Sequence, residues 1–176
     1  MRKLRLFLPI VFVISALCGL IYVSVQQALR QTANDPQIQI ARDSSQLLEQ
    51  GKTPQDIIPS SQVDLSKSLN TFIIIFNDAG KPIASQAVLD GRVPTPPQGV
   101  FDYTKTNKED RVTWQPKENV IIASVVERFE GSNPGFILSG RSLEETEKRV
   151  SALGQRLLAG WLVSIIGSLV LILLFA

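Results

Sequence analysis

The stretch TFIIIFNDAG, residues 71–80, decides the fold. Residues 71–76 are aromatic and β-branched on both alternating faces, which is typical of a central strand covered from two sides. The NDAG that follows is a turn signal, and residues 81–89 can return as the second strand of a hairpin. A sheet with this buried hairpin is therefore the first prediction.

Three more strands are predicted further along the chain, at residues 111–115, 120–128 and 135–139. Before them, the proline-rich residues 93–97 leave the sheet, because proline has no backbone N–H to donate to a neighbouring strand. Residues 98–110 form either a short helix or a loop. Five strands in largely hairpin order predict an antiparallel sheet and, with helices around it, an α+β fold.

A helix is predicted ahead of the sheet. Asp35 is expected to cap it and Pro36 to begin it, and Gly51 is a natural residue to end it after about Gln50. Its apolar residues form an irregular stripe along one side of the helix, so we expect the helix to pack on the surface of a core and not to pass through its interior. Residues 52–70 are expected to form a connector that contains proline and serine.

Another helix is predicted after the last strand. Ser142 and Glu145 have the spacing of a capping box, which opens a charged helix over residues 143–156. No residue after it breaks the helix before the apolar end of the chain. We therefore expect the folded middle of the chain and its apolar C-terminal run to share one helix.

Two runs of twenty residues, 6–25 and 157–176, carry no charge. Each matches the roughly 20 residues that a helix needs to cross a bilayer. The runs divide the chain into a basic tail (1–5), a first transmembrane helix, a central domain (26–156) and a second transmembrane helix. A buried core helix is the alternative for either run, and a cleaved signal peptide is the alternative for the first.

The basic residues Arg2, Lys3 and Arg5 precede the first run and predict a cytoplasmic N-terminus. The central domain is then extracytoplasmic, and the protein is a multi-pass protein of the inner (plasma) membrane. The second run reaches Ala176 with no basic residue after it. Either the chain ends at the inner interface, or the sequence is the front part of a longer receptor.

Composition excludes several kinds of chemistry. The chain has 176 residues and no histidine, so it contains no Ser-His-Asp triad and no phosphoacceptor histidine. Cys18 is its one cysteine, and a net charge of +2 does not indicate a nucleic-acid surface. No motif predicts a metal site or a cofactor. We therefore expect a protein that is not an enzyme and that binds no nucleic acid.

Small residues recur within both apolar runs and predict helix packing. In the second run they lie on one helical face, where a partner helix can approach closely. A shorter version of the pattern occurs in the first run. The alternative is that glycine and serine are simply common in transmembrane helices. The predicted packing residues are Ser15, Gly19, Gly160, Ser164, Gly167 and Ser168.

The layout resembles the extracytoplasmic PAS-like (Cache or PDC) sensor domains of bacterial sensor histidine kinases and chemoreceptors. The resemblance lies in the first apolar run, the strand and turn over 71–80, the patch RVTWQP at 111–116 and the patch GRSLE at 140–144. It implies a five-stranded antiparallel sheet with helices, detection of a small molecule outside the cell, and dimerisation along the helices. The chain departs from such kinases because it has no transmitter region.

Polar and aromatic side chains on the later strands and the preceding loop are the candidate ligand-binding residues. They are Tyr103, Arg111, Trp114, Ser124 and Arg128. For Trp114 a place in the core is the alternative, and for the two arginines the alternative is solvated charge at strand ends.

Two functions follow as hypotheses. The first is a membrane-anchored sensor of an unknown small molecule or envelope condition, which signals through the shared helix as a homodimer or through a kinase-type partner. The second is a non-signalling interaction or scaffold protein of the cell envelope.

Overall fold

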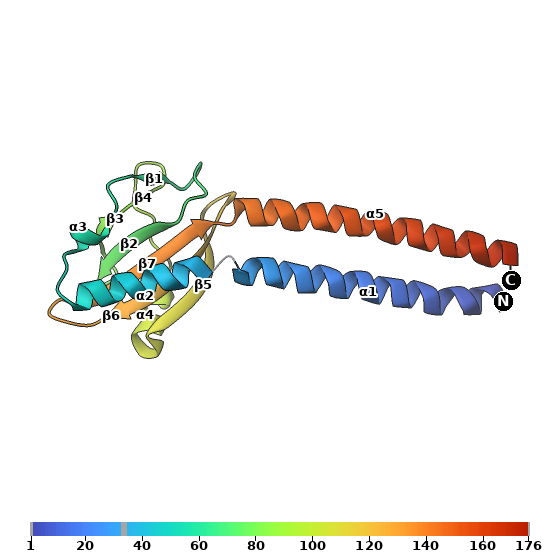
Figure 1. The fold of residues 1–176 in the computed structure, drawn as a ribbon, viewed down its shortest axis with the longest axis horizontal. Coiled ribbons are helices and arrows are strands. Elements are labelled where there is room, and N and C mark those ends of the chain that lie inside the picture. Colours follow the sequence, from blue (N-terminus) through green and yellow to red (C-terminus); the bar gives the residue numbers. More distant parts are fainter. Residues whose placement is uncertain (1, 33–34, 176) are drawn as a thin grey trace. The chain divides into compact units, whose positions relative to one another are not determined.

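The computed structural model describes residues 2–32 and 35–175. The chain forms two compact units, Met1–Gln31 with Thr146–Ala176, and Thr32–Glu145. The second unit contains a five-stranded antiparallel sheet with flanking helices, so the predicted α+β class is confirmed (Figure 1).

The main sheet has the strand order β3-β2-β7-β6-β5. Its strands are β2 (Phe72–Asn77), β3 (Pro82–Ser85), β5 (Glu109–Lys117), β6 (Val120–Phe129) and β7 (Gly135–Ser142). Strands β2 and β3 form the predicted hairpin, and β5, β6 and β7 follow one another as neighbours. Strand β7 joins the hairpin to the other strands, because it pairs with β6 on one side and with β2 on the other, where Phe72 lies opposite Gly140.

The second strand of the hairpin is shorter than predicted. It ends at Ser85, and residues Ala87–Val88 (β4) pair instead with Val63–Asp64 (β1) in a parallel two-stranded sheet. The side chain of Ser85 explains the change of direction, since its Oγ donates to the carbonyl oxygen of Ala87 and accepts from the N–H of Ala87. The predicted connector, residues 52–70, contains β1 and the short helix α3 (Pro54–Ile57).

The edge strand β5 is longer than predicted and irregular. It continues past Pro116 to Lys117, and its register with β6 shifts between Trp114 and Lys117. Of the two alternatives for residues 98–110, the helix is correct for Gln98–Asn107 (α4). The helix stops where Lys108 adopts a positive φ of 67°, a conformation that does not continue a right-handed helix.

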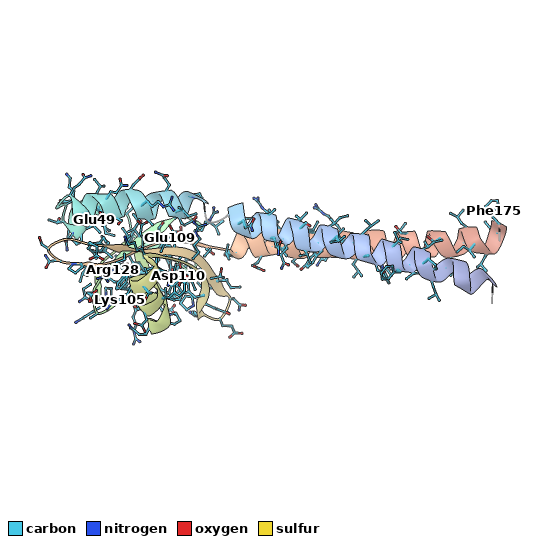
Figure 2. The ribbon with its side chains drawn as sticks, turned by 90° about the horizontal axis from the view of Figure 1, so that it is seen from below. Glu49, Lys105, Glu109, Asp110, Arg128 and Phe175 are labelled. Carbon is cyan, nitrogen blue, oxygen red and sulfur yellow. The ribbon has the colours of Figure 1, made fainter. Side chains whose placement is uncertain are left out.

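Two helices cover the opposite faces of the sheet: α2 (Asp35–Glu49) lies on one face and α4 on the other (Figure 2). The predicted helix cap at Asp35 depends on a side chain that lies outside the described ones. Side chains alternate along each strand, so Phe72, Ile74 and Phe76 face α4, whereas Ile73 and Ile75 face α2. The predicted central strand is therefore covered on both sides.

Close packing on the α4 face depends on a glycine. A Cβ added to Gly140 would lie 2.6 Å from the ring of Phe72. The ring is fully buried, so it has little room to move away. Glycine at this position allows β2 and β7 to pair in the observed register.

The other unit consists of α1 (Arg2–Thr32) and α5 (Glu144–Phe175). Both contain segments long and apolar enough to cross a membrane, Phe7–Leu29 and Glu144–Phe175, with hydropathies of 2.4 and 2.6. In both segments, the most apolar stretch of 18 residues contains no buried residue. Helix α5 begins one residue later than predicted, and the Oγ of Ser142 accepts a hydrogen bond from the N–H of Glu144.

Candidate functional site

Trp114 and Ser124, two of the five predicted ligand-binding residues, lie together in the core on the α4 face. The indole Nε1 of Trp114 donates to the Oγ of Ser124 at 3.0 Å, and that hydroxyl donates to the carbonyl oxygen of Val112 at 3.3 Å. Trp114 is 8% exposed and Ser124 is completely buried. Both side-chain polar groups therefore have a hydrogen-bond partner within the protein, and these bonds stabilise the pairing of β5 with β6.

Arg128 belongs to a charged cluster at the end of β6. Its Nη1 donates to Oδ1 of Asp78 at 2.7 Å and its Nε to Oε1 of Glu130 at 2.8 Å. Lys105 of α4 donates to the other oxygen of Asp78, and the guanidinium lies 5.4 Å from the ring centroid of Phe136. Hydrogen bonds from Arg128 and then from Lys105 lower the pKa of Asp78. The cluster ties α4 to the β2–β3 turn.

The remaining two predicted residues lie elsewhere. Arg111 is on the α2 face of β5, where its Nε donates to Oε1 of Glu109 at 2.7 Å. Tyr103 is on α4 and is 53% exposed. The structure therefore brings Trp114 and Ser124 together and does not bring Tyr103 or Arg111 to them.

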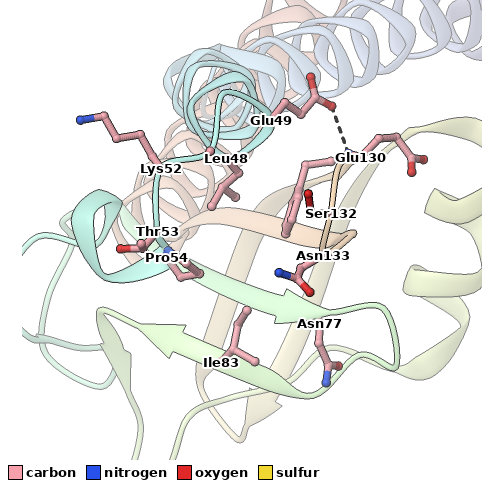
Figure 3. A pocket seen from close by; sticks show the side chains of 12 residues that line it. Leu48, Glu49, Lys52, Thr53, Pro54, Asn77, Ile83, Glu130, Ser132 and Asn133 are labelled. Atoms are coloured by element: carbon pink, nitrogen blue, oxygen red, sulfur yellow. Dashed lines mark hydrogen bonds between the residues drawn. The ribbon is translucent and has the colours of Figure 1, made fainter.

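A cavity of about 550 Å³ lies at another place in the same unit (Figure 3). Its volume is in the range of about 300–1,000 Å³ that is typical of small-molecule sites. Three connecting segments meet there: the α2–α3 loop, the β2–β3 hairpin and the β6–β7 loop. The lining residues are Leu48, Glu49, Gly51, Lys52, Thr53, Pro54, Asn77, Ile83, Phe129, Glu130, Ser132 and Asn133.

The cavity wall is apolar on one part and polar on another. Leu48, Pro54, Ile83 and Phe129 supply the apolar part, and Phe129 is almost fully buried. Oε1 of Glu49 accepts a hydrogen bond from the backbone N–H of Glu130 at 3.1 Å, which fixes the end of α2 against the β6–β7 loop (Figure 3).

Neutral polar groups complete the wall. Asn77 is held by its Oδ1, which accepts from the N–H groups of Ala79 and Lys81, while Asn133 and Ser132 come from the opposite loop. The side chain of Lys52 points away from the cavity in Figure 3. An amide group beside apolar side chains suits a small solute with both a polar and an apolar part.

Sequence reasoning missed this cavity. Its residues come from positions 48–54, 77–83 and 129–133, which the patterns mark as helix ends and turns. Their proximity depends on strand pairing across the whole sheet. The signals available in the sequence were Gly51 and Gly131. Both adopt positive φ values in the structure, as glycine at a turn often does. Such glycines mark where the chain turns, but they do not show that the turns lie close together.

The predicted packing residues lie in the unit formed by α1 and α5. The indole of Trp161 donates to the Oγ of Ser15 at 2.9 Å. The hydroxyls of Ser164 and Ser168 donate to carbonyl oxygens one turn earlier, at Gly160 and Ser164. A Cβ at Gly19, Gly160 or Gly167 would meet no atom within 4 Å in the described chain, so these glycines leave open space on their helices.

Among residues 2–32 and 35–175, the structure places no three His, Cys, Asp or Glu side chains where they could hold a metal ion.

Comparison of the chain with protein-family models, with curated proteins and with solved structures gives no significant match.

Proposed function

We propose that the chain is a membrane-anchored sensor with a PAS-like (Cache or PDC type) domain. Helices α1 and α5 cross the inner membrane, the N-terminus is cytoplasmic and the domain is outside the cytoplasm. The domain detects a small solute, and the signal passes through α5 to a kinase-type partner or to a transmitter region beyond the given sequence. Lipid and a second copy of the chain are its other partners.

The observation that carries the proposal is the connection between β7 and α5. Strand β7 is paired on both sides, with β2 and β6. Only Leu143 separates it from α5; this residue is 1% exposed and its N–H donates to the carbonyl oxygen of Ile121 at 2.8 Å. A change in the sheet can therefore reach the charged start of α5, the 32-residue helix whose later part is apolar, through a single buried residue.

The cavity supports detection of a solute. Each of its three segments leads directly into a strand of the sheet or the end of α2, so a bound molecule changes the contacts between them. We expect the ligand to be small and uncharged, because the side chain of Lys52 points away from the cavity and the carboxylates of Glu49 and Glu130 already accept hydrogen bonds from the protein.

Binding can be tested on the full chain in nanodiscs by a thermal-shift screen against a metabolite library. A hit is expected to lose its effect in Asn133→Ala, which removes an amide from the cavity wall. The matched control is Asn70→Ala, because Asn70 is exposed and does not line the cavity. A hit that is equally effective on both variants contradicts the cavity as the site.

Transmission can be tested with single cysteines in a Cys18→Ser background. Crosslinking between copies through Gly160→Cys is expected to change when a hit is added, whereas Leu162→Cys, which lies two residues on and so on the opposite face of α5, serves as the control. Leu153→Pro breaks the helix at a cost of about 3 kcal/mol, and is expected to leave the domain folded and abolish the ligand-dependent change. An unaltered change in that variant excludes transmission through α5.

The orientation has its own test. A reporter that is active only outside the cytoplasm is expected to be active when it is inserted after Gly131. The second candidate, an interaction or scaffold protein of the envelope, is favoured if the screen gives no hit and a defined envelope protein copurifies.

A further inference from the structure

The helix α2 packs on the sheet partly through apolar side chains, since Ile38, Ile40 and Leu48 are partly buried against the core cluster of that face. Its most buried residues are Gln37, Ala41, Ser44 and Ser45. Gln37 is completely buried, and neither its Oε1 nor its Nε2 has a hydrogen-bond partner among the described residues. A buried polar side chain without a partner weakens the packing around it. Polar and charged groups therefore affect how firmly α2 is held.

The charged groups beneath α2 include two carboxylates in direct opposition. Glu109 of β5 and Glu127 of β6 are register partners in the antiparallel pair, and like charges at such positions repel each other. Glu109 is neutralised by cations, since Oε2 accepts from Arg42 of α2 at 3.0 Å and Oε1 accepts from Arg111 at 2.7 Å. Glu127 has no such partner, and its Oε2 is buried without a hydrogen bond.

We propose that Glu127 makes the seating of α2 on the sheet acid-responsive: proton uptake by this carboxyl group holds the helix more firmly, and proton loss loosens it. The charged groups that face Glu127 or share its side of the sheet come from three elements, Arg42 and Glu49 of α2, Glu109 and Arg111 of β5, and Arg141 of β7. Arg42 and Arg111 are both bonded to Glu109, and among the described residues neither forms an ion pair with Glu127, so Arg42 offsets the charge of Glu127 only from a distance.

The titration behaviour of the two carboxyl groups agrees with this geometry. Burial first, and then the nearby charge of Glu109, raise the pKa of Glu127 above 4.5; the charge of Arg42 opposes this in part, and that of Glu49 adds to it. For Glu109 burial acts in the same direction, but the hydrogen bonds from Arg111 and Arg42 outweigh it and lower the pKa. Acidification therefore protonates Glu127 while the Arg42–Glu109 ion pair remains.

The sign of the effect follows from proton linkage. Glu127 binds its proton more tightly when α2 covers it than when it is exposed to water, so acid favours the covered state. If the two states differ by one pKa unit, the opening of α2 becomes about tenfold rarer on the acid side. The inference depends on neither the cavity nor the membrane spans.

Hydrogen exchange of the full chain in nanodiscs tests the proposal. Amides of α2 in the wild type are expected to exchange several-fold more slowly at about pH 4.5 than at about pH 7.5, after correction for intrinsic rates. In Glu127→Gln, which imitates the protonated group, they are expected to be slow at both values. Glu118→Gln is the matched control, because Glu118 is exposed in the β5–β6 turn, and it is expected to behave as the wild type.

A second measurement covers the case in which Glu127→Gln folds poorly. Carbon-13 NMR of labelled glutamate carboxyl groups is expected to show one group that titrates above the others, and Glu109→Gln is expected to move that titration toward lower pH. The proposal is overturned if α2 exchange in the wild type does not depend on pH, if Glu127→Gln keeps the wild-type dependence, or if no carboxyl group titrates high.

Discussion

On the α4 side of the sheet, buried aromatic rings pack against one another, whereas on the α2 side aliphatic contacts are interspersed with buried small and polar side chains. Phe101 lies 5.0 Å from Phe76 and 5.1 Å from Phe136 between ring centroids. Within the described residues, the buried side-chain atoms without a hydrogen-bond partner all lie on the α2 side, in Gln37, Glu127, Ser139 and Arg141. The α2 side therefore carries buried polar groups that lower its stability, and we expect it to open more easily than the α4 side.

The largest expected effect is on the aromatic side. Phe101→Ala removes the ring between Phe76 and Phe136 and is expected to lower the free energy of unfolding by about 3–5 kcal/mol. Chemical denaturation of the full chain in detergent, followed by circular dichroism, measures it. Tyr103→Ala on the same helix is the control and is expected to change stability by less than about 0.5 kcal/mol, because Tyr103 is exposed. Equal losses in the two variants contradict the assignment of the core.

The next effect tests the close approach of β7 to Phe72. Gly140→Ala is expected to destabilise the domain by about 1–3 kcal/mol, because the added methyl group meets a ring with no free space. Gly99→Ala in α4 is a matched control, since a Cβ there meets no atom within 4 Å. It is expected to stabilise the helix by up to about 1 kcal/mol. A neutral Gly140→Ala means that Phe72 is not confined as described.

A smaller effect is expected from pH, and its sign distinguishes the two sides. Since the folded-state pKa of Glu127 is raised above 4.5, its contribution to stability falls as pH rises through the window between 4.5 and the raised value. The lowered pKa of Asp78 acts oppositely, and its contribution is lost only as pH falls below 3.8. Denaturation curves of the wild type and Glu127→Gln are expected to converge on acidification, and curves that stay parallel reject the assignment.

The smallest effect is expected at the surface of the α2 side. Arg42→Gln breaks the ion pair with Glu109, in which Arg42 is half exposed, and is expected to cost no more than about 1 kcal/mol of global stability. Exchange of the α2 amides is expected to become faster while the amides of β7 are unchanged. If both segments change together, α2 does not move independently of the sheet.

The sequence predicted the central parts of the fold for a physical reason. Residues 71–76 are apolar on both faces, so no pairing partner was needed to recognise a central strand. Residues 63–64 were missed because β1 is two residues long and is defined by a partner, Ala87–Val88, that is distant in the sequence. Such strands carry no periodicity of their own.

The candidate site was harder to predict than the fold. Trp114 and Ser124 were selected as ligand groups, yet the register of β5 against β6 places them within hydrogen-bonding distance of each other. That register depends on an irregularity at Pro116 that no pattern reveals. The cavity residues lie in three segments that only the finished sheet brings together.

The two outer strands of the sheet have a consequence for behaviour at high concentration. Unpaired strand edges promote the growth of aggregates by addition of strands from other molecules. Strand β3 is only four residues long and begins at Pro82, and β5 has Pro116, charged side chains and a shifted register. Both borders thus discourage unwanted polymerisation, which matters for a protein whose copies would be crowded together on a two-dimensional surface.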